Sequence, residues 1–192
     1  MGTRNLTIVK KNGEYKVAQY GQWDGMPSGN GLKVLGFARS LSHLPFRKEF
    51  EEKVAAASYF TKKEIEDVYQ KIREGTISDL ENEYPQLSRN MGAGVLEFVC
   101  TSSLGVKLEN DINFAADSLF CEWAWVIDLD NNTFEGYKGF NDSNPLTPDD
   151  RFYFLRDKEK DGYHAIQLIA KWELNNLPSN NSFLATFGIG EE

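Results

Sequence analysis

Residues 5–21 read NLTIVKKNGEYKVAQYG, two alternating runs joined by an Asn-Gly pair. Residues 5–10 and 15–20 alternate apolar and polar side chains over most of their length, which is typical of strands with one buried face. Asn12 and Gly13 suit a two-residue hairpin turn, because both central positions of that turn need positive φ. This stretch therefore predicts an antiparallel hairpin around which the rest of the chain can pack.

A loop rich in glycine and proline follows the predicted hairpin over residues 21–31. Such residues interrupt regular structure. From Leu32 onward, apolar residues recur at helical spacing and predict a helix with one apolar face. The loop thus joins the end of a strand to the start of a helix.

Polar and aromatic side chains gather at this end of the hairpin, and each needs solvent, a partner or a ligand. We expect Arg4 to pair with a carboxylate or phosphate and Trp23 to supply a stacking face. The alternative is an internal ion pair between Arg4 and Asp24 that holds the loop, with Trp23 covering the core. The candidate ligand-binding residues are Arg4, Gln19, Tyr20, Gln22, Trp23, Asp24 and Ser28.

The rest of the chain alternates helical and strand patterns. Residues 46–80 have helical spacing and include a capping box at Thr61 and Glu64, and a further helical run reaches Val99. A second hairpin is predicted from residues 119–129 and 133–137. Residues 163–174 favour a strand, with a buried helix as the alternative, and residues 183–189 favour an edge strand. We therefore predict an α+β fold with antiparallel sheets built from hairpins packed with helices, in a single domain over residues 1–192.

Composition narrows the classes of function. The formal net charge of −8 and the pI near 4.9 argue against binding a nucleic-acid backbone, which needs clustered cations. A small anionic ligand would need only a local basic pocket, which this composition allows. No apolar run reaches the length of a membrane span, and the start lacks the pattern of a signal peptide, so we expect no membrane partner and a cytoplasmic location.

The sequence offers little support for a metal, a cofactor or a disulfide. Cys100 and Cys121 lie in apolar runs without metal-ligand or redox spacing, and we expect both to be free thiols. His43 and His164 are far apart in the chain and have no cysteine nearby. We therefore expect neither a metal site nor a bound cofactor.

Two resemblances involve the first 31 residues. The order of strand, tight turn, strand and then Trp23-Asp24-Gly25 resembles the start of the bile-salt-hydrolase group of N-terminal-nucleophile hydrolases. That resemblance implies a sandwich fold and a substrate-orienting role for Asp24. Gly2 occupies the nucleophile position and cannot serve there, so an enzyme of this type would use Thr3 after loss of the first two residues.

The closer resemblance is to an uncharacterised family of bacterial genomes and prophages. Its members open with Gly-Thr-Arg-Asn-Leu-Thr and carry a Tyr-Gly-Gln-Trp-Asp-Gly-x-Pro-x-Gly-x-Gly loop, as residues 2–31 do, and residues 137–141 also resemble it. The family has no established activity. Its occurrence in phage genomes implies a role in conflict between phage and host, such as capture of a nucleotide signal or inhibition of a defence protein.

Three functions follow as hypotheses. The first is a phage- or prophage-associated binding protein on a degenerate N-terminal-nucleophile-hydrolase-like fold, which captures a nucleotide or another anionic metabolite and has no catalytic role. The second is an amidohydrolase with Thr3 as its nucleophile. The third is an acidic inhibitor of a host protein in the bacterial or infected cell, acting through helices that carry residues such as Glu64 and Glu74. The oligomeric state is left open, with a homodimer among the options.

Overall fold

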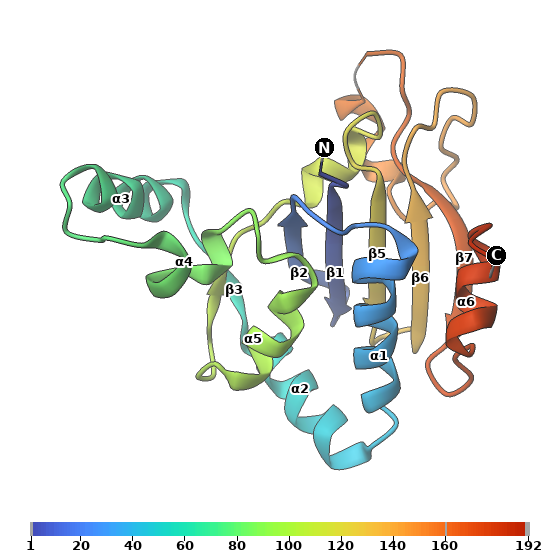
Figure 1. Cartoon of the computed structure of the whole chain (residues 1–192), viewed down its shortest axis with the longest axis horizontal. Coiled ribbons are helices and arrows are strands. Elements are labelled where there is room, and N and C mark those ends of the chain that lie inside the picture. Colours follow the sequence, from blue (N-terminus) through green and yellow to red (C-terminus); the bar gives the residue numbers. More distant parts are fainter. Residues whose placement is uncertain (1, 160, 191–192) are drawn as a thin grey trace.

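A mixed five-stranded sheet forms the centre of the computed structural model, which describes residues 2–159 and 161–190 (Figure 1). The strands lie in the order β2-β1-β5-β6-β7. The central pair β1 and β5 is parallel, and every other neighbouring pair is antiparallel. The strands span Asn5–Lys11 (β1), Glu14–Gly21 (β2), Trp123–Asp128 (β5), Thr133–Lys138 (β6) and Gln167–Glu173 (β7).

Both predicted hairpins are confirmed. Asn12 and Gly13 have φ values of 56° and 77°, as the tight turn between β1 and β2 requires. The register places Asn5 opposite Gly21, so the start of the first strand meets the end of the second. In the second hairpin, β5 and β6 turn through Asn132, which also has positive φ.

Helices cover one face of the sheet. They span Leu32–Ser40 (α1), Leu44–Ala56 (α2), Val95–Thr101 (α5) and Asn180–Thr186 (α6), with short turns at Pro27–Gly31 (η1) and Gly92–Gly94 (η3). The main core lies between these helices and the sheet, where Trp125, Phe134 and Phe183 are fully buried. The indole Nε1 of Trp125 donates to the carbonyl of Gly25 at 3.0 Å, which ties the loop after β2 to the core.

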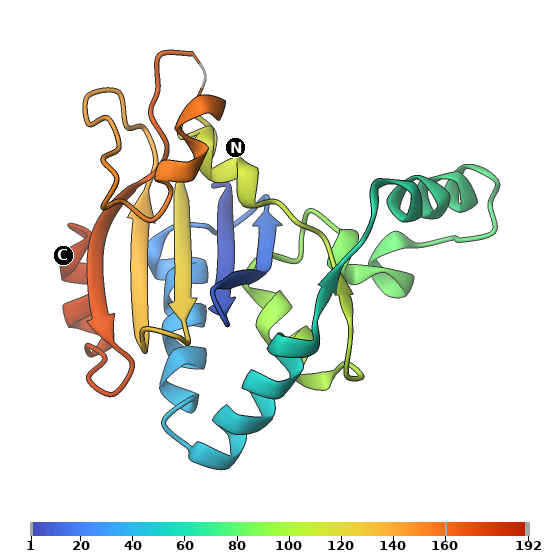
Figure 2. The same cartoon turned by 180° about the vertical axis from the view of Figure 1, so that it is seen from behind.

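Two short helical segments, η4 (Ile112–Ala116) and η5 (Tyr153–Lys158), pack over one end of the opposite face (Figure 2). A second buried cluster lies there and includes Leu6, Ile8 and Val126 from the sheet together with Phe152 and Leu155. Alternate residues of the central strands therefore face two different apolar layers.

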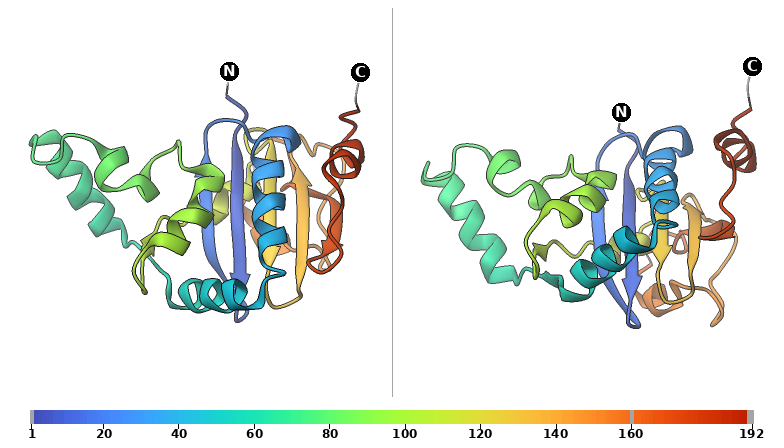
Figure 3. Two further views of the ribbon diagram at one scale, coloured as in Figure 1. Left: turned by 60° about the horizontal axis from the view of Figure 1, so that its bottom comes forward. Right: turned by 90° about the horizontal axis from the view of Figure 1, so that it is seen from below.

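An arm projects from the β2 edge of the sheet, as the views of Figure 3 show. It contains α3 (Lys62–Arg73), α4 (Leu80–Glu83) and η2 (Pro85–Leu87), and a two-stranded sheet of β3 (Ser58–Tyr59) and β4 (Lys107–Leu108) connects it to the body. Val68, Ile77 and Leu87 form a small core of its own. The predicted capping box at Thr61 and Glu64 is confirmed at the start of α3.

The α+β class is confirmed, but the prediction that the sheets are antiparallel throughout is wrong, and the described residues do not form the sandwich of two stacked sheets that the hydrolase resemblance implied. The sheet is mixed because β1 pairs in parallel with β5, which joins the two hairpins through their first strands. The second sheet has only two residues in each strand. Among the described residues, no helix is long and apolar enough to cross a membrane.

The edge strand predicted at residues 183–189 is wrong, because the helix α6 and a turn occupy this segment. Ser179 caps the helix by accepting a hydrogen bond from the backbone N–H of Ser182 at 3.2 Å. Phe183 and Phe187 are four residues apart and both contact the Trp125 ring. A short apolar run with this spacing can bury one helical face as well as one strand face.

Candidate ligand-binding site

The predicted site residues divide between several environments. Gln19 is buried, Tyr20 and Gln22 are half-buried, and Trp23, Asp24 and Ser28 are exposed. The loop does lie beside the start of β1, because the Gly25 N–H donates to the Thr3 carbonyl at 2.9 Å. The side chains, however, do not form one pocket.

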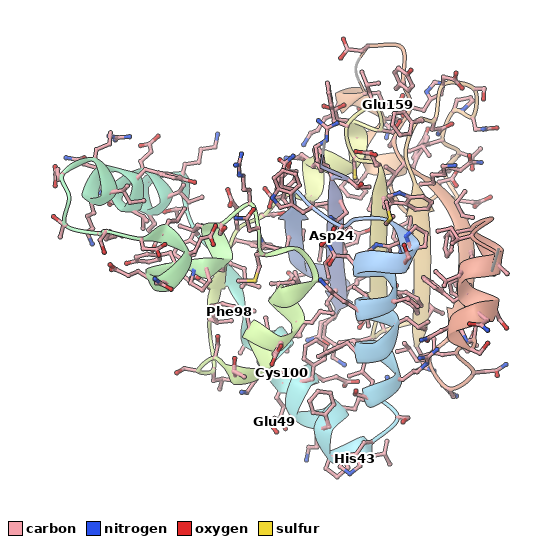
Figure 4. The ribbon with its side chains drawn as sticks, in the orientation of Figure 1. Asp24, His43, Glu49, Phe98, Cys100 and Glu159 are labelled. Carbon is pink, nitrogen blue, oxygen red and sulfur yellow. The ribbon has the colours of Figure 1, made fainter. Side chains whose placement is uncertain are left out.

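The alternative ion pair between Arg4 and Asp24 is not the pair in the structure. Arg4 instead pairs with Glu122, whose carboxylate lies 3.8 Å from its Nε, and its guanidinium lies 4.6 Å from the centre of the Phe120 ring. Among the described residues, the Asp24 carboxylate has no hydrogen-bond or ion-pair partner. Asp24 lies on the loop near the start of α1 (Figure 4), and its backbone has a positive φ of 55°.

Trp23 is a surface residue and does not cover the core. Its side chain is 48% exposed, and its indole Nε1 donates to Asn90 Oδ1 at 2.8 Å. Asn90 in turn donates to the carboxylate of Glu81, which also accepts from the Ser88 hydroxyl. Trp23 thus contacts the segment that leads from the arm back to η3.

A pocket of about 380 Å³ lies beside this segment, between the outer edge of β2 and the arm. Two of the predicted residues, Gln19 and Tyr20, line it. The full lining is Gln19, Tyr20, Tyr69, Leu80, Glu81, Leu87, Ser88, Arg89, Glu109 and Asp111. This volume is within the range of small-molecule sites.

Asp111 occupies the edge of β2 where another strand would otherwise pair. Its N–H donates to the Ala18 carbonyl at 2.8 Å, and its carboxylate accepts from the Tyr20 N–H at 2.9 Å. Burial raises the pKa of Asp111 to about 6, and the hydrogen bond from Tyr20 only partly opposes this effect. No lysine or arginine of the described chain forms an ion pair with it.

Glu109 precedes Asp111 by two residues, and the negative charge of its carboxylate also has no cationic partner among the described residues. Its carboxylate has no hydrogen-bond or ion-pair partner within the described residues. Desolvation, together with the nearby charge of Asp111, raises the pKa of Glu109 to about 7. Perturbed carboxylates that line a cavity are candidates for a functional site.

Gln19 contributes a further unsatisfied group. Its side chain is 1% exposed, and its Nε2 donates to the Tyr20 carbonyl at 3.3 Å. Its Oε1 is buried and accepts no hydrogen bond from the described residues. Most buried polar atoms in folded proteins have a partner, so an orphaned amide oxygen in a pocket wall requires an explanation.

The loop and the pocket share a hydrogen-bonded wall. The Tyr20 hydroxyl donates to Gln22 Oε1 at 2.6 Å, and the Gln22 N–H donates to the Arg89 carbonyl at 2.8 Å. Burial raises the pKa of Tyr20, so its phenol stays protonated and able to donate. The loop therefore positions one side of the pocket, although Ser28 and Asp24 do not line it.

A second polar pocket lies on the η5 side of the sheet but is built as a structural network. Arg151 donates to Glu135 at 2.7 and 2.8 Å and to Asp128 at 2.7 Å. Glu135 also accepts from Tyr137 and Thr133. Each buried charge therefore has its partners, and the network leaves no comparable group among the described residues for a ligand to satisfy.

The two histidines lie apart and do not meet at a common site. Figure 4 shows His43 at the connection between α1 and α2, at the opposite end of the molecule from Glu159. His164 is 3.0 Å from Glu159 through its Nδ1. Both cysteines are free, as predicted, with Cys121 buried and Cys100 half-buried on α5.

Sequence reasoning missed most of the pocket. The residues it did not select are Tyr69, Leu80, Glu81, Leu87, Ser88, Arg89, Glu109 and Asp111. The only local signal was the acidic pair of Glu109 and Asp111, which in sequence is typical of a solvated surface segment. Its position beside Gln19 depends on the tertiary fold.

No family model, curated protein or solved structure matches this chain. The resemblances described from residues 2–31 therefore stay predictions.

Proposed function

We propose that this protein binds a small molecule in the pocket between β2 and the arm. The observation that carries the proposal is the set of unsatisfied polar groups in one cavity. Among the described residues, the carboxylates of Glu109 and Asp111 lack cationic partners, and Gln19 Oε1 lacks a donor. Gln19 Oε1 is the fully buried member of this set, and leaving such an atom without a donor costs about 1–3 kcal/mol, which a bound ligand would recover.

The lining also suits a ligand with both apolar and polar parts. Tyr69, Leu80 and Leu87 give the pocket apolar surface, and Tyr20 adds a half-buried ring. Small-molecule sites combine such surface with a few fixed polar groups. A binding role agrees with the first of the three sequence hypotheses, but the three carboxylates of the lining do not favour the anionic ligand that this hypothesis named. The phage association and the hydrolase ancestry are supported by the resemblances alone.

The hydrolase alternative has less support from the geometry. Thr3 uses its carbonyl to accept from Gly25, and a side chain at Gly2 would meet the Gln22 carbonyl at 2.3 Å. Neither residue is among those that line the pocket. The unsatisfied groups that support ligand binding therefore lie elsewhere than the residue that an amidohydrolase would use.

Native mass spectrometry of the protein, purified without dialysis, tests the proposal together with a Tyr69→Ala variant. Tyr69 is 39% exposed on α3, so its removal should leave the fold intact while opening the pocket. We expect a small molecule bound to the wild type and at least tenfold less of it bound to Tyr69→Ala. Phe154→Ala removes a similarly exposed aromatic side chain outside the pocket and serves as the control.

Equal retention by wild type and Tyr69→Ala would exclude this pocket as the site. If no molecule is retained, a thermal-shift screen of metabolites decides the matter, and a screen in which none stabilises the wild type more than Tyr69→Ala would contradict the proposal.

A further inference from the structure

Three acceptor groups of the pocket lining have unused capacity for hydrogen bonds. Asp111 uses its carboxylate for one backbone N–H, Glu109 accepts no hydrogen bond from the described residues, and Gln19 Oε1 is orphaned. Arg89 is the only cationic residue in the lining formed by the described chain. We infer that the ligand is an organic cation, a primary ammonium or guanidinium group that donates N–H hydrogen bonds to Glu109, Asp111 and Gln19. This inference rests on the proposed binding function.

Charge favours a cation over an anion at this position. Glu81, Glu109 and Asp111 oppose the single charge of Arg89, and the described residues form no ion pair within this group. An anion would meet uncompensated carboxylates in a partly desolvated cavity, where repulsion is screened less than at the surface. A cation would instead supply the partner that the carboxylates lack.

The aromatic lining favours an organic cation over a metal ion. The rings of Tyr20 and Tyr69 contribute to the walls, and aromatic faces attract ammonium and guanidinium groups. The described residues contain no cluster of three or more histidine, cysteine, aspartate or glutamate side chains positioned to hold a metal. The pocket volume of about 380 Å³ also exceeds the space that one ion fills.

The same geometry gives binding a pH dependence. The titratable or charged groups around the two carboxylates are Tyr20, Tyr59, Tyr69, Glu81 and Arg89. The pKa of each of the three tyrosines is raised, so all three stay neutral near pH 7. The carboxylates of Asp111 and Glu109 therefore control the change in charge, and affinity for a cation should fall as the pH decreases from 8 to 5.

Isothermal titration calorimetry of the full chain with agmatine tests the inference, because agmatine carries an ammonium and a guanidinium group and no carboxylate. Glutarate, of similar length and opposite charge, is the matched anion. We expect saturable agmatine binding at pH 8 that weakens at least tenfold at pH 5. Glu109→Gln and Asp111→Asn should each weaken it about tenfold, the effect of losing one charged hydrogen bond.

Glu66→Gln is the control variant. It makes the same change in net charge on the exposed face of α3, outside the pocket lining. Agmatine affinity should stay within about twofold of wild type in this variant. An equal loss in Glu66→Gln and Glu109→Gln would show non-specific attraction to an acidic protein and would overturn the inference.

Two other outcomes also overturn it. Absence of agmatine binding at roughly 10 mM, where even weak specific contacts give a signal, would exclude the cation site. Binding of glutarate that is lost in Arg89→Gln and retained in Asp111→Asn would show that the pocket takes anions. In that case the proposed binding function would stand while its ligand class would change, so the two proposals can fail separately.

Discussion

The side-chain amides of Asn5 and Asn30 hydrogen-bond to each other at 3.2 Å inside the protein and join β1 to the loop after β2. Asn5 is fully buried. Its Oδ1 accepts from Asn30 Nδ2, while its own Nδ2 donates to the carbonyls of Gly21 and Trp23. Asn30 donates to the same Trp23 carbonyl at 3.1 Å. Buried amides therefore set the shape of the glycine-rich loop.

Asn5→Ala should lower the free energy of unfolding by about 2–4 kcal/mol. The substitution removes a donor to two loop carbonyls and leaves buried polar groups unpaired. Urea denaturation of both proteins measures the loss. Ser28→Ala, at an exposed position of the same loop, should stay within about 0.5 kcal/mol of wild type. A loss below about 1 kcal/mol in Asn5→Ala would show that the loop holds its shape by other contacts.

Gly139→Ala should destabilise the protein severely, by about 3 kcal/mol or more. A Cβ at this position would lie 2.1 Å from the Cys121 carbonyl oxygen and 2.5 Å from that of Ser118, and backbone atoms cannot move aside cheaply. Thermal melting of the variant measures the loss.

Gly36→Ala is the matched control for Gly139→Ala. Gly36 is exposed in α1, and a Cβ added to it would have no neighbouring atom of the described residues within 4 Å beyond its own helical turn. The substitution should stabilise the helix by about 0.5–1 kcal/mol. Equal melting temperatures for the two variants would contradict the close backbone approach at Gly139.

Local signals account for the parts of the fold that could be predicted. The Asn12-Gly13 turn and the capping box of Thr61 and Glu64 depend on neighbours a few residues away. The apolar run at residues 183–189 was misassigned because its period is ambiguous over so few residues. The parallel pairing of β1 with β5 depends on contacts between distant segments, which alternation alone does not encode.

The site was predicted only at its edge for the same reason. Gln19 and Tyr20 were selected because they lie at the end of the hairpin, and both line the pocket. Asp111 was not selected from the sequence, because the residue it contacts, Tyr20, lies 91 positions away in the chain. A carboxylate in a polar segment also gives no sign in the sequence that folding will desolvate it.

Arg151→Met should cost about 3–5 kcal/mol at pH 7, because it removes the hydrogen-bonded cation of two buried carboxylates and leaves them only the longer ion pairs with Lys10 and Lys171. Burial alone would raise the pKa of Glu135 and of Asp128, but hydrogen bonds, including those from Arg151, outweigh it and lower both. A carboxylate whose pKa is lower in the folded than in the unfolded state stabilises the fold at any pH above its unfolded-state pKa. This stabilisation is lost as the pH falls through its folded-state pKa.

The cost of Arg151→Met should therefore shrink as the pH approaches about 3, which chemical denaturation at several pH values would measure. Arg156→Met removes a more exposed arginine that contacts Tyr153 and Asp157, and should cost less than about 1 kcal/mol. A cost for Arg151→Met that does not change with pH would show that packing, rather than charge, accounts for its role.

Glu109→Gln and Asp111→Asn should stabilise the protein at pH 8, by about 1–2 kcal/mol each after solvent screening is allowed for. Their folded pKa values of about 7 and about 6 exceed the ordinary values of 4.5 and 3.8. The folded state then binds more protons than the unfolded state between these limits, so their contribution to stability falls as the pH rises through that window.

The stabilisation by these two variants should accordingly be absent at about pH 4 and largest at about pH 8. Unfolding free energies of wild type and variants across this range measure it. Asn at position 111 can still accept from the Tyr20 N–H, so that contact is kept. A constant difference across the range would show that the carboxylates are not desolvated.

Trp23→Phe should distinguish the contribution of the indole hydrogen bond from the contribution of the aromatic surface, which phenylalanine largely keeps. The indole Nε1 donates to Asn90, which donates to Glu81 in the pocket wall, and the phenyl ring cannot replace this donor. Since Trp23 is 48% exposed, the free energies of unfolding of Trp23→Phe and Trp23→Ala should both lie within about 1 kcal/mol of the wild-type value. Truncation of the buried Trp125 should instead cost about 3–5 kcal/mol.

Calorimetry should show that both Trp23 variants bind agmatine a few fold more weakly than wild type and equally so, because they lose the same positioning contact. A large loss of melting temperature in Trp23→Phe would assign the residue to the core, and full affinity in Trp23→Ala would show that the pocket wall does not depend on this loop.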